Sequence, residues 1–282
     1  MPRTSDEQAV IDRFSRIYRV AQSEFMLEIE RSVCGCDYGV TRWTTRQEAE
    51  NVLGMLELRP RQRLLEIGAG AGWPGLYLAK RSGCDLALID LPLDGLRVAK
   101  QRAASDQLNG SHWIALADAS ALPFRDGLFD AVYHSDVLCC LLRKLEVLQA
   151  CRRVVRIDGK MLFSVIFIPP GSSTADCAQA KAGGHPFVEV EGSYQEILGL
   201  AGWNITVRVD LTSEFLESAR RHLLGLEAHA SDIVNAFGIE EAAAMLTRRR
   251  ATVSVLEEGL LRRDLFSCVP HCGSLRLSNG SE

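Results

Sequence analysis

Between residues 63 and 168, short apolar runs alternate with amphipathic segments, and this alternation constrains the fold more than any other feature. The apolar runs are RLLEIGA, DLALIDL, HWIALADA, LFDAVYHSD and GKMLFSVIFI. The segments between them include helices predicted over 74–81, 94–107 and 144–156. Strands that alternate with helices form a mostly parallel sheet with helices on both faces. Ligands of such sheets bind beyond the carboxyl ends of the strands.

The flanking regions are predicted to be mainly helical. Helices are expected over 5–33, with Ser5 as the cap, over 45–58, capped by Thr44 or Thr45, and over 194–200. A loop follows Pro169 and extends to about residue 186, and VLCCLL after Asp136 is read as a helix. After a strand over 203–211, two or three helices precede a last strand over 264–270 and a disordered tail. The predicted division is an N-terminal helical cap (1–50), a core (51–212), a helical lid (213–263), and the last strand with the tail (264–282).

The glycine-rich stretch EIGAGAGWPG follows the first apolar run and satisfies two fingerprints at once. Read from Gly70 it is GxGxxG, which is typical of dinucleotide sites. Read from Glu66 it is ExGxGxG, which is typical of enzymes that use S-adenosyl-L-methionine (SAM). Both ligands require a tight turn and a close approach of the backbone. A carboxylate at Glu66 would repel a pyrophosphate but suits the methionyl ammonium of SAM. No Ser/Tyr/Lys set for hydride transfer is recognisable, which also disfavours a nicotinamide cofactor.

Five motifs in chain order resemble class I SAM-dependent methyltransferases: LLEIGAGAG, LALIDLP, ADASALPF, FDAVYHSD and ACRRVVRIDGKMLFSVI. The resemblance covers roughly residues 42–211. It implies a three-layer, Rossmann-like α/β fold with a seven-stranded, mostly parallel sheet and a helical lid. It also implies a SAM site. In that site the methionyl ammonium would lie near Glu66 and the backbone carbonyl of His134, and the methionine and ribose would lie along Gly68, Ala69, Gly70 and Gly72. The ribose would be held by Asp90 and Leu91, and the adenine by Asp118 and Ala119. Asp90 and Asp118 could instead cap helices or stabilise turns.

Candidate catalytic residues cluster at the end of the fourth run, in YHSDVLCC. His134 is the best candidate for a general base, because histidine titrates near neutrality. The alternative for His134 is a packed core histidine. Strand alternation would put Asp136 on the same face, where it could orient an amine or cap the next helix. The motif resembles the corresponding region of phosphoethanolamine and sarcosine/dimethylglycine N-methyltransferases, in which an N-terminal tyrosine closes over the cofactor. Tyr38 is our candidate for that tyrosine, with Tyr18 and Trp43 also available.

The expected reaction is methyl transfer to nitrogen or oxygen of a small molecule. C-methylation of a quinone-like or polyketide ring is the alternative within this class, and a non-catalytic SAM-binding protein is the alternative outside it. No phosphate-binding group is evident after the fifth strand, so we expect an acceptor less charged than a phosphobase. The run from Arg248 to Arg250 is read as a solvated helix face. His222 and His229 share a helix face that could meet the pocket or the solvent.

Composition bears on partners and compartment. The chain has 32 Lys and Arg against 36 Asp and Glu among 282 residues, so no broad basic field favours nucleic acid. Its nine cysteines are scattered, no signal segment begins the chain, and no run reaches the ~18 apolar residues of a membrane span. We therefore expect a cytoplasmic protein with no membrane partner and no metal, although Cys34/Cys36 and Cys268/His271/Cys272 are conceivable ligands. The sequence decides neither the acceptor nor the oligomeric state.

Overall fold

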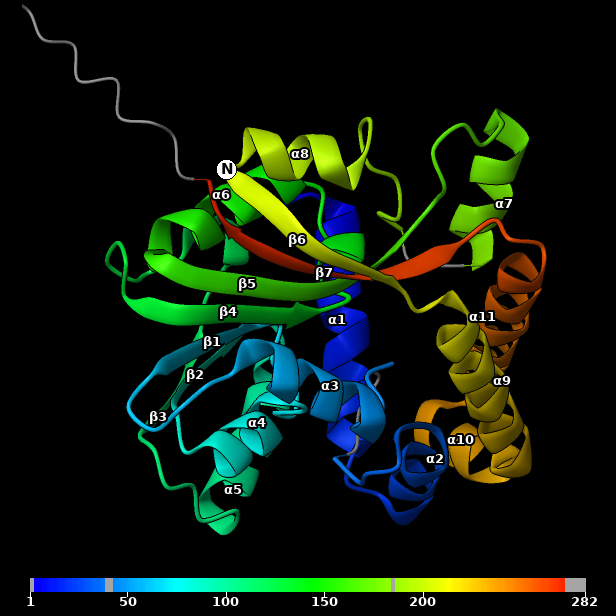
Figure 1. Ribbon diagram of the computed structural model, residues 1–282. Coiled ribbons are helices and arrows are strands. Elements are labelled where there is room, and N and C mark those ends of the chain that lie inside the picture. Colours follow the sequence, from blue (N-terminus) through cyan, green and yellow to red (C-terminus); the bar gives the residue numbers. More distant parts are fainter. Residues whose placement is uncertain (1–2, 39–42, 184–185, 272–282) are drawn as a thin grey trace, which may run out of the picture.

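The computed structural model describes residues 3–38, 43–183 and 186–271. Figure 1 shows a central sheet with helices on both faces, and a group of helices beside one end of the sheet. The helices are α1 (Ser5–Val20), α2 (Glu24–Cys34), α3 (Arg46–Leu56), α4 (Gly75–Ser82), α5 (Leu93–Ser105), α6 (Lys144–Val154), α7 (Thr174–Gly183), α8 (Tyr194–Leu200), α9 (Thr212–Ala228), α10 (Ala230–Phe237) and α11 (Ile239–Glu257). The strands are β1 (Arg63–Ile67), β2 (Asp85–Asp90), β3 (His112–Leu116), β4 (Phe129–Ser135), β5 (Val155–Phe167), β6 (Trp203–Asp210) and β7 (Arg262–Pro270).

The described strands form one seven-stranded sheet in the order β3-β2-β1-β4-β5-β7-β6. Strands β1 to β5 pair in parallel, and β7 lies antiparallel between β5 and β6. This confirms the predicted mostly parallel, Rossmann-like sheet. The chain order reverses at β1, because β2 lies on one side of it and β4 on the other, which is where such sheets bind ligands.

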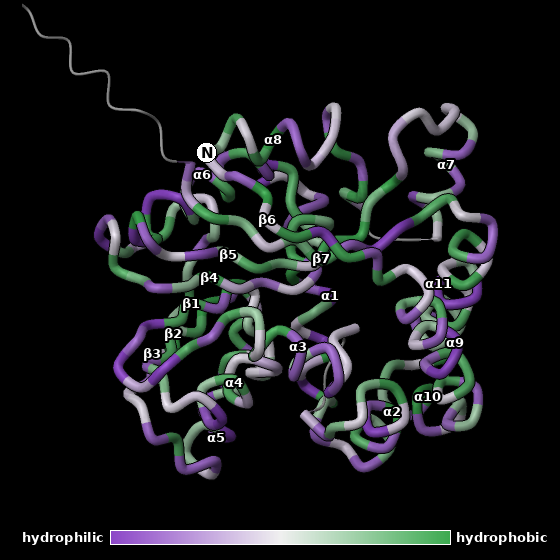
Figure 2. Tube along the Cα trace, viewed as in Figure 1, coloured by the Kyte–Doolittle hydropathy of each residue, from purple (hydrophilic) through white to green (hydrophobic). Residues whose placement is uncertain are grey.

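Alternate residues of the strands pack into two hydrophobic layers, one on each face of the sheet. Leu65 and Ile67 pack in the cluster that includes α6 and α8, whereas Leu64 packs in the cluster that includes α3, α4 and α5. This two-sided burial follows from the period of two along a strand. Figure 2 shows hydrophobic residues along the central strands β1, β4 and β5. Both faces of the central strands are therefore covered, as the alternation of strands and helices predicted, whereas the edge strand β3 is largely exposed.

Three local predictions were wrong. The expected helix over 5–33 is broken between Val20 and Glu24, where the Ser23 hydroxyl donates to the carbonyl of Val20 (2.7 Å). Within the expected loop, residues 174–183 form α7, which packs against α11. The run VLCCLL forms only a 3-10 turn over Leu138–Cys140.

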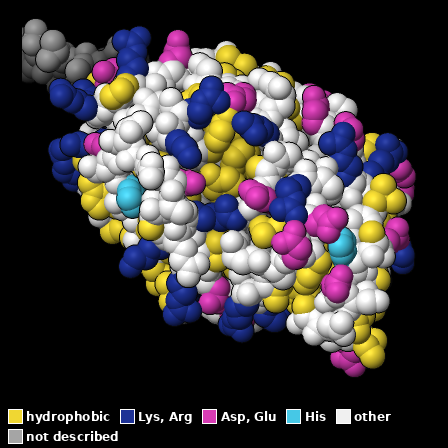
Figure 3. All heavy atoms as spheres, turned by 90° about the horizontal axis from the view of Figure 1, so that it is seen from below, with side chains coloured by type: hydrophobic (Ala, Val, Ile, Leu, Met, Phe, Trp, Pro, Cys, Tyr) yellow, Lys and Arg dark blue, Asp and Glu magenta, His cyan; other side chains and the backbone are white. Residues whose placement is uncertain are grey.

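The insertion between β6 and β7 is helical. Helices α9, α10 and α11 follow one another there, and α9 packs against α2 of the N-terminal region. None of the described helices is both long and apolar enough to cross a membrane. On the face in Figure 3, acidic and basic side chains are intermixed, with hydrophobic side chains between them. The predicted tail lies outside the described residues, apart from His271.

Candidate active site

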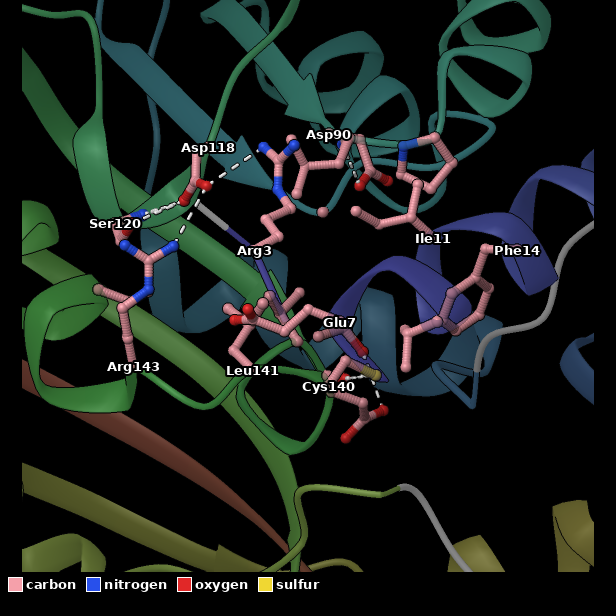
Figure 4. Close-up of a pocket in the computed structure, with 18 of the residues that line it drawn as sticks. Arg3, Glu7, Ile11, Phe14, Asp90, Asp118, Ser120, Cys140, Leu141 and Arg143 are labelled. Atoms are coloured by element: carbon pink, nitrogen blue, oxygen red, sulfur yellow. Dashed lines mark hydrogen bonds and ion pairs between the residues drawn. The ribbon is translucent and has the colours of Figure 1, made fainter. Parts of the chain in front are cut away.

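A cavity lies at the carboxyl ends of the parallel strands, with about 970 Å³ of empty space that includes its opening to solvent. The core contributes Gly68 after β1, Asp90 at the end of β2, Asp118 after β3, and Ser135 and Asp136 at the end of β4. The other wall is α1, whose side chains reach over these strand ends (Figure 4). The position and the size are those expected of a small-molecule site in an open α/β sheet.

The glycine loop has a backbone that few other residues could adopt. Gly68, Gly70 and Gly72 have φ values of 67°, 51° and 95°. A Cβ atom on Gly68 would also lie 2.4 Å from Cγ2 of Val137, which lines the cavity. Glycine is therefore required both for the turn and for the space. The loop is held from below by Ala69, whose N–H donates to the carbonyl of Ile89 (2.9 Å).

Asp90 joins the glycine loop to the end of β2. Its Oδ2 accepts a hydrogen bond from the N–H of Gly70 (2.7 Å), and its Oδ1 accepts one from the N–H of Leu91 (2.7 Å). Leu91 lines the cavity beside it. A carboxylate can accept about four hydrogen bonds. The geometry therefore fits both a positioned carboxylate and an acceptor for ligand hydroxyls.

Asp118 serves two functions at once. Its Oδ1 accepts hydrogen bonds from the N–H (2.9 Å) and the hydroxyl (2.7 Å) of Ser120, so it caps the following 3-10 turn. Its Oδ2 faces the guanidinium groups of Arg3 (3.3 Å) and Arg143 (3.5 Å) (Figure 4). Burial alone would raise the pKa of Asp118, but the bonds from Ser120 and the two arginines lower it. Ala119 is buried and does not line the cavity, whereas Ser120 does.

Helix α1 covers the cavity with one face. Glu7, Ile11, Phe14 and Tyr18 line it and recur at three- and four-residue steps, so they project from the same side of the helix. Tyr18 packs closely against Gly95 at the start of α5, where an added Cβ would meet its ring at 2.9 Å.

Part of the chain matches a known protein family. Residues 65–163 match the protein family described as a methyltransferase domain. The matched segment runs from β1 into β5 and so includes the glycine loop, Asp90 and Asp118.

Two further similarities extend beyond that segment. The sequence is 25% identical over 221 residues to phosphoethanolamine N-methyltransferase of Triticum aestivum, covering 78% of this chain and 43% of the relative. The chain thus spans less than half the length of the curated relatives it matches first. The structure of Haemonchus contortus phosphoethanolamine N-methyltransferase 2 with phosphomonomethylethanolamine and S-adenosylhomocysteine gives a TM-score of 0.73 at 16% identity, over 91% of this chain and 59% of that chain.

A third similarity concerns the fold alone. The [4+2]-cyclase SpnF gives a TM-score of 0.73 at 18% identity and covers 97% of this chain and 99% of that chain. Since a protein described as a cyclase shares this architecture, the assignment of an activity must rest on the site and not on the fold.

Glu66 does not line the cavity. It is fully buried, and its Oε2 accepts a hydrogen bond from the N–H of Gly75 (3.0 Å) at the start of α4. A carboxylate at a helix N-terminus accepts a hydrogen bond from an otherwise unbonded N–H and interacts favourably with the positive end of the helix dipole. This geometry makes Glu66 a support for the loop and does not fit the predicted contact with an ammonium group.

His134 does not fit the predicted role of general base. Its ring is fully buried and stacks on Phe163 with centroids 4.8 Å apart, and neither ring nitrogen has a hydrogen-bond partner among the described residues. Burial lowers the pKa of His134 to about 3, so the imidazole is neutral and weakly basic at physiological pH. It does not line the cavity, and its backbone carbonyl remains our only prediction for cofactor contact at this residue.

Asp136 reaches the cavity because β4 ends one residue earlier. Its φ of 54° breaks the alternation, so Ser135 and Asp136 both line the cavity. The expectation that Asp136 shares a face with His134 was therefore wrong. Tyr38 is also misplaced for its predicted role: its hydroxyl donates to Asp106 (3.1 Å), its ring lies against Trp73, and it does not line the cavity. Tyr18 and Trp43, the two other aromatic candidates from the sequence, do line it.

Sequence reasoning missed the arginine that holds Asp136. The Arg263 side chain is 1% exposed, and its Nε donates to both carboxylate oxygens of Asp136 (3.0 and 3.1 Å). Its two terminal nitrogens donate to the two carboxylate oxygens of Glu48 (2.9 and 2.8 Å). Two carboxylates thus share one buried guanidinium directly beside the cavity. No sequence motif linked these residues, since 127 and 215 positions separate Arg263 from its partners.

Metal binding finds no support in the described residues, where no group of three or more His, Cys, Asp or Glu side chains could hold an ion. Of the candidate set near the C-terminus, Cys272 lies outside the described residues. Cys268 is buried, and its burial raises the pKa of the thiol to about 12. Such a thiol stays protonated, whereas a metal ligand must be a thiolate.

Proposed function

We propose that this chain binds SAM in the cavity under α1 and transfers its methyl group to nitrogen or oxygen of a small-molecule acceptor. The observation that carries the proposal is the placement of Asp90 and Asp118 on one cavity, beside a glycine loop whose backbone leaves no room for side chains. Carboxylates at the ends of neighbouring strands suit the ribose hydroxyls and the adenine amino group. The match to the methyltransferase domain supports the same reading.

When bound, SAM supplies an activated methyl group on a sulfonium, so the protein's main contribution is alignment and exclusion of water. Helix α1 provides the cover, because its apolar side chains Ile11 and Phe14 face the cavity. Alignment of reactants is worth up to roughly 7–11 kcal/mol in model reactions. A cationic donor is also favoured by the aromatic faces of Tyr18 and Trp43.

Asp136 is the group best placed to act on an acceptor. Its carboxylate lies on the cavity, and Arg263 fixes its orientation. A carboxylate there can accept a hydrogen bond from an N–H or O–H of the acceptor and turn the lone pair toward the methyl group. Asp136 is thus a better candidate than His134 for orienting or deprotonating the acceptor.

The test is a pair of measurements on the whole chain. Calorimetry should show that SAM binds and that NAD does not, and Asp90→Ala should weaken SAM binding about 10- to 100-fold by removing charge-assisted bonds. A panel of small-molecule amines, phenols and carboxylic acids should then yield S-adenosylhomocysteine with at least one acceptor. Tight NAD binding without SAM binding would overturn the cofactor assignment. Mass spectrometry of the methylated product then separates N-, O- and C-transfer.

A further inference from the structure

A second cavity lies behind the first, between α1, α2 and the inserted helices α9 and α11. It has about 930 Å³ of empty space including its opening. Much of its wall is apolar, with Met26, Ile166 and Phe215 among the lining residues. Phe14 and Trp43 line both cavities. The two cavities therefore adjoin at these two side chains.

The charges in this wall are unbalanced. Three arginines line it, Arg13 from α1 and Arg248 and Arg249 from α11, against the single carboxylate of Glu30. Glu30 is 3% exposed and interacts with the thiol of Cys34. Among the described residues, none of the three arginines makes a salt bridge. By contrast Arg250, the next residue along α11, pairs with Glu227 at 2.7 Å.

Arg249 is held in place without a counter-charge. Its guanidinium carbon lies 4.4 Å from the ring centroid of Trp43, and its buried Nε has no hydrogen-bond partner in the part of the chain that the structure describes. Trp43 is fixed in turn by Phe215, with ring centroids 4.8 Å apart. The Nδ1 atom of His222, which lies edge-on to Trp43, is also buried without a partner. Unsatisfied buried donors are uncommon in folded proteins and call for a ligand or water.

Electrostatics agree with the geometry. Burial is the main cause that lowers the pKa of Arg249, to about 9, and the positive charges of Arg248 and Arg13 add to it. An anion bound among these three side chains would reverse both effects, because it supplies hydrogen-bond acceptors and an opposite charge. Planar guanidinium groups are well suited to carboxylate and phosphate oxygens.

We infer that the second cavity binds the anionic group of the acceptor, a carboxylate or a phosphate carried on an apolar body, through Arg249 with Arg13 and Arg248. The inference rests on the proposed function in calling this ligand the methyl acceptor. It revises the sequence-based expectation of a solvated helix face for the whole run from Arg248 to Arg250. A phosphate would also revise the expectation of an acceptor less charged than a phosphobase, whereas a carboxylate would agree with it. The apolar wall places the body of such a molecule toward Trp43 and the first cavity.

Three probes of similar size separate charge from shape: benzoate, phenyl phosphate and the neutral benzamide. Titration calorimetry on the whole chain should show that one or both anions bind, with benzamide at least about tenfold weaker. The comparison of benzoate with phenyl phosphate identifies which anion the cavity takes. Arg249→Met should weaken the bound anion about tenfold or more, whereas the matched variant Arg250→Met should leave it within about twofold.

Arg248→Met provides a second variant in case Arg249→Met does not fold, and thermal melting checks both. Equal binding of benzoate, phenyl phosphate and benzamide by the wild type, or equal anion affinity in the Arg249 and Arg250 variants, overturns the inference. SAM affinity is measured on the same samples. Anion binding without SAM binding would support the anion site and contradict the proposed function. SAM binding without anion binding would support the proposed cofactor and contradict the anion site.

Discussion

Arg263→Met is the substitution with the most predictable consequence in this fold. Methionine keeps the length of the side chain and removes its charge. Glu48 and Asp136 are 7% and 8% exposed at their side chains, and both direct their carboxylates at the Arg263 guanidinium. The variant would leave two buried carboxylates without the cation they share. Removing one partner of a buried ion pair destabilises proteins by about 3–5 kcal/mol.

Protonation sets a limit to that loss. A carboxyl group with an ordinary pKa near 4 can be kept neutral at pH 7 for about 4 kcal/mol, at about 1.36 kcal/mol per pH unit. In the variant, the folded-state pKa of a stranded carboxyl rises above its unfolded value, so the folded state binds more protons and its stability falls as the pH rises. Acidification from pH 7 to pH 5 should therefore recover about 2.7 kcal/mol for each stranded carboxyl whose folded-state pKa lies above 7. Burial already raises the pKa of Glu48 in the wild type, so the gain relative to the wild type comes mainly from Asp136.

Urea unfolding at pH 7 and pH 5 measures the stability that the variant loses and the part that acidification recovers. Arg262→Met is the matched control, since Arg262 is exposed on the same strand and should change stability by less than about 0.5 kcal/mol. Adding Glu48→Gln to Arg263→Met removes one stranded charge and should restore part of the loss at pH 7. The reasoning fails if Arg263→Met costs no more than the control, or if its deficit is the same at both pH values.

Three other predictions concern single residues. Gly68→Ala should lose about 1–3 kcal/mol of stability and weaken SAM binding, because its Cβ would lie 2.4 Å from Val137. Adding Val137→Ala should restore part of the stability, measured by unfolding, and part of the SAM affinity, measured by calorimetry. His134→Leu should flatten the acid dependence of stability, because the depressed folded pKa of about 3 costs the wild type about 2 kcal/mol by pH 5, relative to neutral and higher pH. Parallel stability curves of the two proteins would contradict this. Tyr38→Phe should leave kcat and SAM affinity within about twofold, since its hydroxyl bonds Asp106 outside the cavity, and a large loss of kcat would return Tyr38 to the active site.

The sheet was predictable because its information is local. Strands β1, β2, β4 and β5 are apolar runs that are mostly buried, whereas the edge strand β3 is largely exposed although it is also an apolar run. The strand ends also fix the neighbourhood of Asp90 and Asp118, because the carboxyl ends of parallel strands meet at one edge of the sheet. The ligand side of the core could therefore be predicted without coordinates.

The direction of a side chain at a strand end was not predictable. Alternation held for the interior of β4 but failed at Asp136, whose positive φ turns the carboxylate toward the cavity while His134 stays in the core. Glu66 shows the same limit: the fingerprint predicts a carboxylate at that position, yet the N–H of Gly75 holds it away from the cavity. Spacing gives the edge of the sheet on which a residue lies, but local backbone geometry decides where it points.

The arginine run of α11 shows how a finer use of periodicity could have separated a functional residue from its neighbours. Consecutive residues of a helix point about 100° apart, so Arg249 and Arg250 cannot share one environment. Arg249 lies seven residues after Ala242 and seven before Leu256, and both of these are buried. An arginine at a buried heptad position must find a partner, and none of the described carboxylates pairs with it. The helical period thus places Arg249 on the buried side of α11, and the absence of a carboxylate partner among the described residues is what makes an anionic ligand the physical explanation for it.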